Sequence, residues 1–181
     1  MALDFAGRTI VQAGFSAVSY TGIEILNASA AGQNLNITAT NGDDVFTVTP
    51  TGTNALTASL TSSNPNNGAN PVVNAVSVGT FTVDLLGGSD RLVVNGSQAS
   101  ETINVTPTQV TVGALKTVNY VNAEDLQVWG QSGNDTFNVT PSATTTIFVD
   151  GGDPIGSSPG DKLNVNALGN PLIFRSRPAE R

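Results

Sequence analysis

The chain has 181 residues, 39% of them hydrophobic, which is enough to form the core of one domain. Its net charge of −7 disfavours nucleic acid and anionic membranes as partners, because phosphate groups repel a negative surface. The absence of cysteine and histidine excludes disulfides and every catalytic site that needs a thiolate or an imidazole. No apolar run is as long as a membrane helix, so we expect no membrane insertion.

Five segments share the pattern acidic-x-apolar-x-Val-(Thr/Asn), which is typical of a half-buried strand. They begin at Asp44, Asp90, Glu101, Asp135 and Asp161. Since successive side chains of a strand point to opposite faces, the two apolar residues of each segment would lie on one face. The five pairs are Phe46/Val48, Leu92/Val94, Ile103/Val105, Phe137/Val139 and Leu163/Val165.

Glycine-containing turns separate these and further alternating segments, and no amphipathic run of helical length occurs. The sequence therefore predicts an all-β fold. It favours a parallel β-solenoid, a β-helix-like repeat, because similar strand-turn phrases recur in one chain direction and Asn and Thr occur where stacked ladders form. An antiparallel β-sandwich of repeats is the alternative. It is supported by the irregular spacing of the five phrases, whose starts are 46, 11, 34 and 26 residues apart.

Similarity within the chain predicts one domain, 1–181, built from two diverged copies at about 10–95 and 103–166. Residues 18–26 match residues 118–126, with four of nine positions identical. Further on, Asp44 aligns with Asp135, which would place nine extra residues in the first copy.

The first copy also carries a long insertion, residues 51–71, rich in Asn, Ser and Gly. Its centre, 61–71, is expected to be a surface loop or projecting hairpin that the core does not need, because the second copy lacks it. Residues 167–181 would form a C-terminal tail or capping segment, with the two termini at opposite ends of the molecule.

Several phrases carry a resemblance to known proteins: YTGIEIL at 20–26, SGNDTFNVTP at 132–141 and GDKLNV at 160–165. Over about residues 10–168 the chain is similar to the tandem β-strand-repeat regions of very large bacterial secreted or cell-surface proteins. This resemblance implies an extracellular, non-enzymatic module that acts as an adhesin stalk, a scaffold or a self-assembling filament or layer unit. Its partners would be other copies or neighbouring repeat modules, contacted through the ends.

Three turns, at 86–90, 133–135 and 149–153, bear a partial likeness to the glycine/aspartate-rich calcium-binding repeats of repeats-in-toxin proteins, although no two consecutive nine-residue repeats occur. Calcium would suit these carboxylates, since hard cations take oxygen ligands. The alternative is turn formation, in which each side chain accepts a hydrogen bond from a nearby backbone amide. We therefore assign no cofactor and no catalytic or metal residue. The aspartates left open for calcium are Asp84, Asp90, Asp135, Asp150, Asp153 and Asp161.

A glycan-binding or glycan-cleaving β-helix is the alternative function. Glu24 and Glu124 occupy equivalent positions in the two copies, and paired carboxylates can cleave glycosidic bonds when they lie about 5 to 10 Å apart. Trp129, the single tryptophan, could stack on a sugar ring or pack at a strand end. The basic residues Lys116 and Lys162 show no sequence pattern that would bring them together with acids.

Overall fold

The structure, a computed structural model, describes residues 1–63, 69–154, 156 and 158–169. This part of the chain contains strands and turns but no helix, so the predicted all-β class is confirmed and no helix that could cross a membrane is present in it. The strands are β1 (Ala2–Asp4), β2 (Thr9–Val11), β3 (Val18–Ser19), β4 (Ile25–Ser29), β5 (Leu35–Thr38), β6 (Asp44–Gly52), β7 (Ala55–Ser62), β8 (Val72–Val76), β9 (Phe81–Asp84), β10 (Arg91–Asn95), β11 (Thr102–Thr106), β12 (Gln109–Val112), β13 (Val118–Val121), β14 (Asp125–Trp129), β15 (Thr136–Val139), β16 (Thr146–Asp150) and β17 (Lys162–Val165).

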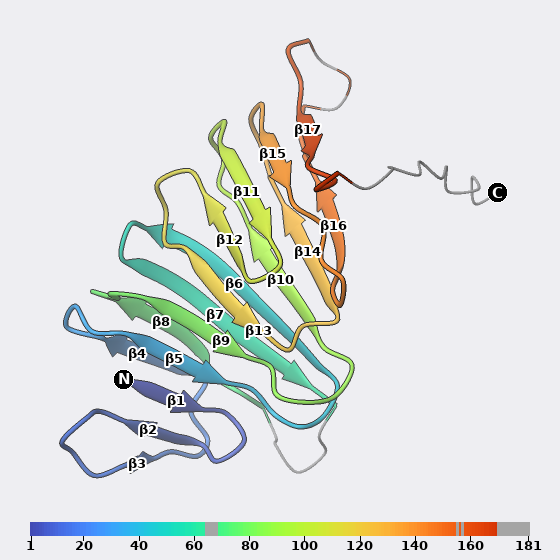
Figure 1. The fold of residues 1–181 in the computed structure, drawn as a ribbon. Helices are drawn as coiled ribbons and strands as arrows, with labels where there is room; N and C mark the ends of the chain where they lie inside the picture. Colours follow the sequence, from blue (N-terminus) through green and yellow to red (C-terminus); the bar gives the residue numbers. More distant parts are fainter. Residues whose placement is uncertain (64–68, 155, 157, 170–181) are drawn as a thin grey trace.

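The strands form two mixed sheets that share one core (Figure 1). Sheet A has ten strands in the order β17-β15-β11-β12-β13-β9-β5-β1-β2-β3, and sheet B has seven in the order β16-β14-β10-β6-β7-β8-β4. Strands from successive passes of the chain pair in parallel, whereas strands within a hairpin pair antiparallel. In sheet A, β1 to β3 and β17 therefore lie at opposite ends.

From β4 onward the chain alternates between the sheets, except at two antiparallel meanders. These are β6-β7-β8 in sheet B and β11-β12-β13 in sheet A. Each meander brings the chain back beside the preceding pass, so that β8 pairs with β4 and β13 pairs with β9. The meanders explain the irregular phrase spacing. Registered partners in β6 and β10 are 46 residues apart, but those in β14 and β16, with no meander between them, are 21 apart.

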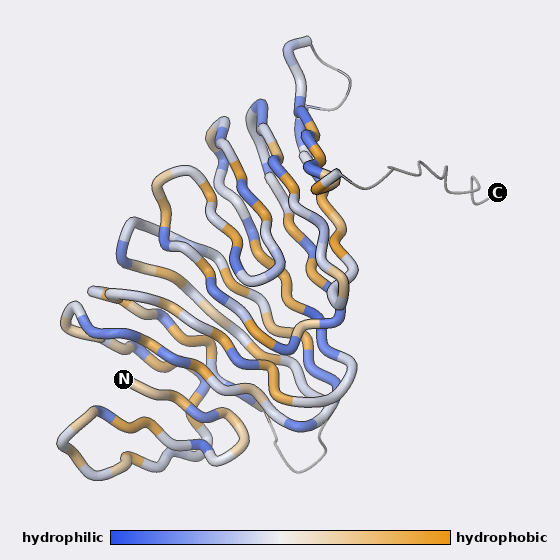
Figure 2. The backbone as a smooth tube through the Cα atoms, in the orientation of Figure 1, coloured by the Kyte–Doolittle hydropathy of each residue, from blue (hydrophilic) through white to orange (hydrophobic). Residues whose placement is uncertain are grey.

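In-register pairing stacks the apolar side chains in columns inside the molecule. One column in sheet B runs from Phe46 through Leu92 and Leu126 to Ile147. Its first three members are fully buried, and each fully buried side chain of this size stabilises the fold by about 1.5–3 kcal/mol. The ring of Phe5, from sheet A, meets Phe46 edge to face with centroids 6.0 Å apart. Figure 2 shows the resulting alternation of hydrophobic and hydrophilic residues along the strands.

The apolar pairs of four phrases are buried as predicted, with at most 8% of any side chain exposed. The fifth pair differs: Leu163 is 56% exposed and Val165 is 36% exposed. Both continue the columns of sheet A, because β17 pairs in register with β15. They are exposed because β17 is the last described strand of that sheet, and no described strand stacks beyond it.

The insertion at 51–71 contains a strand of the core. β7 pairs with β6 along its length and buries Leu56, Ala58 and Leu60. The expectation that the core does not need this insertion is therefore wrong. The predicted surface loop at 61–71 begins too early, since residues 61 and 62 belong to β7, and Pro71 is buried. Residues 64–68, at the centre of that loop, lie outside the described residues.

The strand order relates β1–β6 to β11–β16, because both series visit the sheets in the order A, A, A, B, A, B. The sequence match of 18–26 with 118–126 agrees with this relation. The alignment of Asp44 with Asp135 does not, because it sets β6 of sheet B on β15 of sheet A. Strands of both sheets begin with the same phrase, so an alignment can slip by one strand. The copy boundaries, 10–95 and 103–166, stay a prediction.

Candidate functional site

Acidic residues at or just before the starts of strands hold successive passes of the chain together. In sheet B, Asp90 Oδ1 accepts the backbone N–H of Asp44 at 2.8 Å, and Glu124 Oε2 accepts that of Asp90 at 2.8 Å. In sheet A, Asp135 Oδ1 accepts the N–H of Glu101 at 2.8 Å, and Asp161 Oδ1 accepts that of Asp135 at 2.7 Å. We call these sets the sheet B ladder (Asp44, Asp90, Glu124) and the sheet A ladder (Glu101, Asp135, Asp161).

The first carboxylate of each ladder also closes the turn before its own strand. Asp44 accepts the backbone N–H of Thr40 at 2.8 Å, and Glu101 accepts that of Ser97 at 3.1 Å. Later members of the sheet A ladder lie against glycine. A Cβ added to Gly130 would overlap Asp135 Oδ2 and would lie 2.7 Å from the Gly151 carbonyl oxygen. The turn glycines thus make room for the buried carboxylates.

Burial sets the electrostatics of the ladders. Asp90 is 1% exposed and Asp135 is 0% exposed, and Oδ2 of each has no hydrogen-bond partner among the described residues. Burial raises the pKa of Asp90 to about 6; the N–H of Asp44 opposes this shift, and the carboxylates of Asp44 and Glu124 add to it. Burial likewise raises the pKa of Asp135. Asp90 can therefore take up a proton in mildly acidic solution.

Three of the aspartates considered for calcium, Asp90, Asp135 and Asp161, are members of the ladders. Turn formation does not describe them fully, because each binds an amide that lies 26 to 46 residues earlier in the chain. The signal in the sequence was the fixed place of the acid before apolar-x-Val, which turn formation alone does not require. Within the described ranges, no group of three or more His, Cys, Asp or Glu side chains could hold a metal ion.

Of the other three aspartates, Asp84 and Asp150 are the last residues of β9 and β16, and Asp153 lies in the turn after β16. Asp84 accepts the N–H of Leu86 at 3.0 Å, and Asp150 accepts the N–H of Gly152 at 2.9 Å. These are the local bonds that the turn interpretation predicts. Asp153 is exposed, and its backbone forms an isolated β-bridge with Ser132 of a neighbouring turn.

The structure separates the two equivalent glutamates. Glu24 precedes β4 and Glu124 precedes β14, and four strands of sheet B lie between β4 and β14. At a strand spacing of about 4.8 Å, the two would be roughly 24 Å apart, too far to share a glycosidic bond. Their surroundings also differ, because Glu124 belongs to the sheet B ladder, whereas Glu24 is exposed beside the edge strand.

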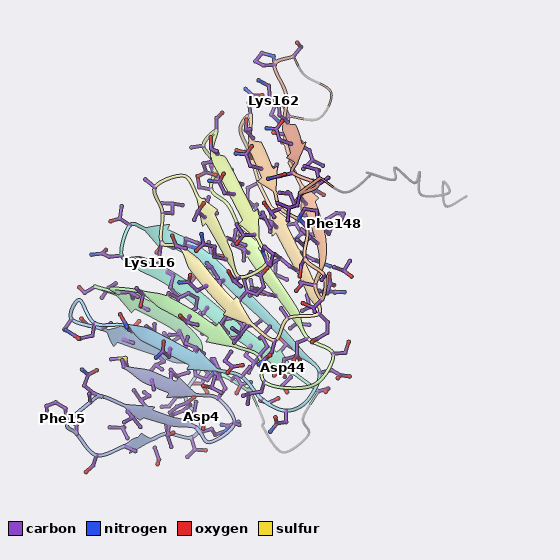
Figure 3. All side chains as sticks on the ribbon, in the orientation of Figure 1. Asp4, Phe15, Asp44, Lys116, Phe148 and Lys162 are labelled. Atoms are coloured by element: carbon purple, nitrogen blue, oxygen red, sulfur yellow. The ribbon has the colours of Figure 1, made fainter. Side chains whose placement is uncertain are left out.

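Among the described residues, Arg91, Lys116 and Lys162 do not converge with acids in a cleft either. Arg91 forms an ion pair with Asp125 at 2.6 Å on the surface. Lys116 Nζ donates to the carbonyl of Gly79 at 2.6 Å. Figure 3 shows Lys116 and Lys162 on separate parts of the molecule.

Trp129 lines a hollow of about 490 Å³ at the end of β14. Its partner in the register is Asp150 of β16, so both side chains lie on the outer face of sheet B. Its ring also contacts Phe148, with centroids 5.7 Å apart and an interplanar angle of 58°. The hollow combines an aromatic ring with amide and carboxylate groups. Its other lining residues are Gln98, Gln131, Ser132, Gly152 and Asp153.

Comparison with protein-family models, with curated proteins and with solved structures finds no match to this chain. The resemblances to bacterial tandem repeats and to repeats-in-toxin turns therefore stay interpretations of the sequence. The ladders, the hollow and the ends of the sheets are the features that bear on function.

Proposed function

We propose that this chain is a non-catalytic structural module of an extracellular bacterial repeat protein, and that it works as a stiff spacer or scaffold. In this proposal the fold is a two-sheeted β-solenoid in which each pass of the chain is one coil. The carboxylate ladders carry the proposal. They add hydrogen bonds between coils to those of the strands, at buried positions where water cannot compete.

Side-chain ladders on the outer surface support the same role. Asn138 Nδ2 donates to Asn104 Oδ1 at 2.9 Å, and Asn164 Nδ2 donates to Asn138 Oδ1 at 2.9 Å. Identical residues thus repeat along the stack outside as apolar residues do inside. A surface built from such rows, with only 12% charged residues in the chain, suits a weakly charged spacer.

Single-molecule force spectroscopy on the full chain, held between reference handles, tests this role. Asp135→Ala removes the acceptor for the Glu101 N–H, so we expect its unfolding force to fall well below that of the wild type. Asp153→Ala, at an exposed position outside the ladders, is the control and should unfold at the wild-type force. A wild-type chain that unfolds without measurable resistance would contradict the spacer role.

Glycan binding is a second candidate, favoured by the hollow at Trp129. Aromatic rings stack on the apolar faces of sugars, and the neighbouring carboxylate and amide groups can bond sugar hydroxyls. The test is a glycan array on the full chain, followed by titration of any ligand found. Trp129→Ala should weaken binding at least tenfold, whereas Phe148→Leu, next to the hollow, should bind as the wild type does. An array without ligands removes this candidate and leaves the structural role in place.

A further inference from the structure

The end of the molecule formed by β2, β3 and β4 has an apolar face in contact with solvent. β3 is the last strand of sheet A and β4 is the last of sheet B, and no described strand pairs with the outer edge of either (Figure 1). Val18 of β3 is 61% exposed, and Phe15, in the turn before β3, is 74% exposed. We call this surface the β3–β4 end. Exposed apolar side chains beside unpaired strand edges are typical of a surface that another strand covers.

The same surface occurs a second time inside the molecule. Ile10 pairs with Val18 in the β2–β3 hairpin, and Val110 pairs with Val118 in the β12–β13 hairpin, each residue 100 positions further along the chain. Val118 is fully buried, although its equivalent Val18 is largely exposed. The structure therefore shows what covers such a hairpin when the covering strands are present.

A unit formed by β6 to β10, residues 44–95, covers the inner surface. β9 pairs with β13, and β10 pairs with β14. The N–H of Lys116, in the turn between β12 and β13, donates to the carbonyl of Gly52 at the end of β6, at 2.8 Å. The N–H of Asp90, just before β10, donates to Glu124 at 2.8 Å.

The β3–β4 end carries the groups that such a unit contacts. Glu24 holds the place of Glu124 and is exposed, so its carboxylate could accept a backbone N–H in the same way. Leu26 holds the place of Leu126, which pairs in register with Leu92 of β10. We propose that the β3–β4 end is a docking surface for a neighbouring repeat module whose last unit resembles residues 44–95. Two strands of that unit would add to β3 and to β4.

A second copy of this chain does not offer such a unit. Its β9 and β10 are already paired on both edges, and its opposite end, β16 and β17, has no sheet B meander among the described strands. The partner is therefore a different module of the same strand-repeat type. This inference rests on the structural role proposed above, for which it names the partner.

A tandem chain tests the docking surface. In it, residues 1–102 are placed directly before Met1 of the complete chain. Met1 holds in β1 the place of Ile103 in β11, because Leu3, two residues on, pairs with β2 and β5 as Val105 pairs with β12 and β15. The added β6 to β10 can then reach the β3–β4 end through the link that joins β10 to β11 in the single chain.

A single thiol reports on the surface, because the chain has no cysteine of its own. Val18→Cys in the complete chain should react with a thiol reagent at least tenfold more slowly when the added unit is present than when it is absent. Val118→Cys gives the rate of a covered position. Thr21→Cys is the matched control and should react equally in both chains, because its equivalent Val121 stays 43% exposed inside the molecule.

The two forms of failure differ. Equal reactivity of Val18→Cys in the single and tandem chains would overturn the docking surface, and it would leave the unfolding force, which tests the structural role, as it is. Reaction of Val18→Cys in the single chain that slows as protein concentration rises would mean that a second copy covers the face. That result would overturn the assignment to a different module.

The register gives a second readout. Val93 and Gln127 are direct neighbours on the outer face of sheet B, and Val93 of the added unit would lie in the same way beside Asn27 of the complete chain. Mild oxidation of this Val93→Cys/Asn27→Cys pair should give a disulfide in the same yield as Val93→Cys/Gln127→Cys in the single chain. The yield should be at least tenfold above that of Val93→Cys/Ser29→Cys, which is two residues out of register. Equal yields in the two tandem pairs would contradict the proposal.

Discussion

Asp90 and Asp135 each combine a stabilising hydrogen bond with an unfavourable burial. One carboxylate oxygen accepts an amide from the preceding pass of the chain, while the other is buried without a partner among the described residues. An ionised carboxylate in this position loses hydration that nothing replaces. Protonation of these two groups should therefore stabilise the fold by relieving this desolvation, although the amide hydrogen bond by itself favours the ionised form.

The first prediction concerns pH. The pKa of Asp90 rises from 3.8 to about 6 on folding, so its contribution to stability is complete below 3.8 and is lost as pH rises through 6. Relative to Asp90→Asn, the free energy of unfolding of the wild type should increase by about 2 kcal/mol between pH 7.5 and pH 4.5, because this range crosses about 1.5 units below the folded pKa of about 6, at about 1.4 kcal/mol per unit. Urea unfolding at several pH values measures this. A constant difference between the two proteins would contradict the buried-carboxyl account.

The second prediction concerns Gly130, whose backbone packs against the Asp135 carboxylate. Gly130→Ala would place a methyl group on Asp135 Oδ2 and against the Gly151 carbonyl, so we expect a loss of about 1–3 kcal/mol in the free energy of unfolding. Gly87→Ala is the matched control, because its Cβ would meet only the side chain of Asn41, at 3.9 Å. Thermal or urea unfolding would show the difference, and equal stabilities would argue against tight packing at the ladder.

At the scale of the element, β7 shows how composition can hide a strand. Its residues are small and polar, but Leu56, Ala58 and Leu60 alternate and lie in the core. Leu56→Ala should lower the free energy of unfolding by about 2–5 kcal/mol. The neighbouring Thr57 side chain points away from the core, so Thr57→Ala should lower the free energy of unfolding by less than about 1 kcal/mol. Similar losses in both variants would show that β7 does not contribute to the core as the structure places it.

Strand alternation was readable in the sequence, but sheet membership was not. The five phrases all form strands, since a period of two with Val, Ile and Phe admits little else. Their sheets could not be predicted, because strands in both sheets begin with the same acid and bury the same apolar pair. The sequence pattern does place the acids at the turns that precede the strands. Their bonds to another pass of the chain depend on which strands are neighbours, and this comes from long-range pairing that local patterns do not encode.

At the scale of the whole molecule, the ladders bear on metal dependence. In the described residues the ladder carboxylates bind backbone amides, Asp125 forms an ion pair with Arg91, and no group of three could hold an ion. We expect the melting temperature to be the same in excess EDTA and in millimolar calcium. A rise of several degrees in calcium would show that the ladders or turns bind the ion after all.

The meanders set a rule for how this architecture can grow. β6-β7-β8 and β11-β12-β13 each add two extra strands to one sheet before the chain crosses to the other. Two reversals restore the original direction, whereas a single extra strand would leave the chain at the wrong edge, pointing backwards. Tolerated insertions of whole strands must therefore come in even numbers, and grafts that respect this parity should leave the neighbouring strands undisturbed.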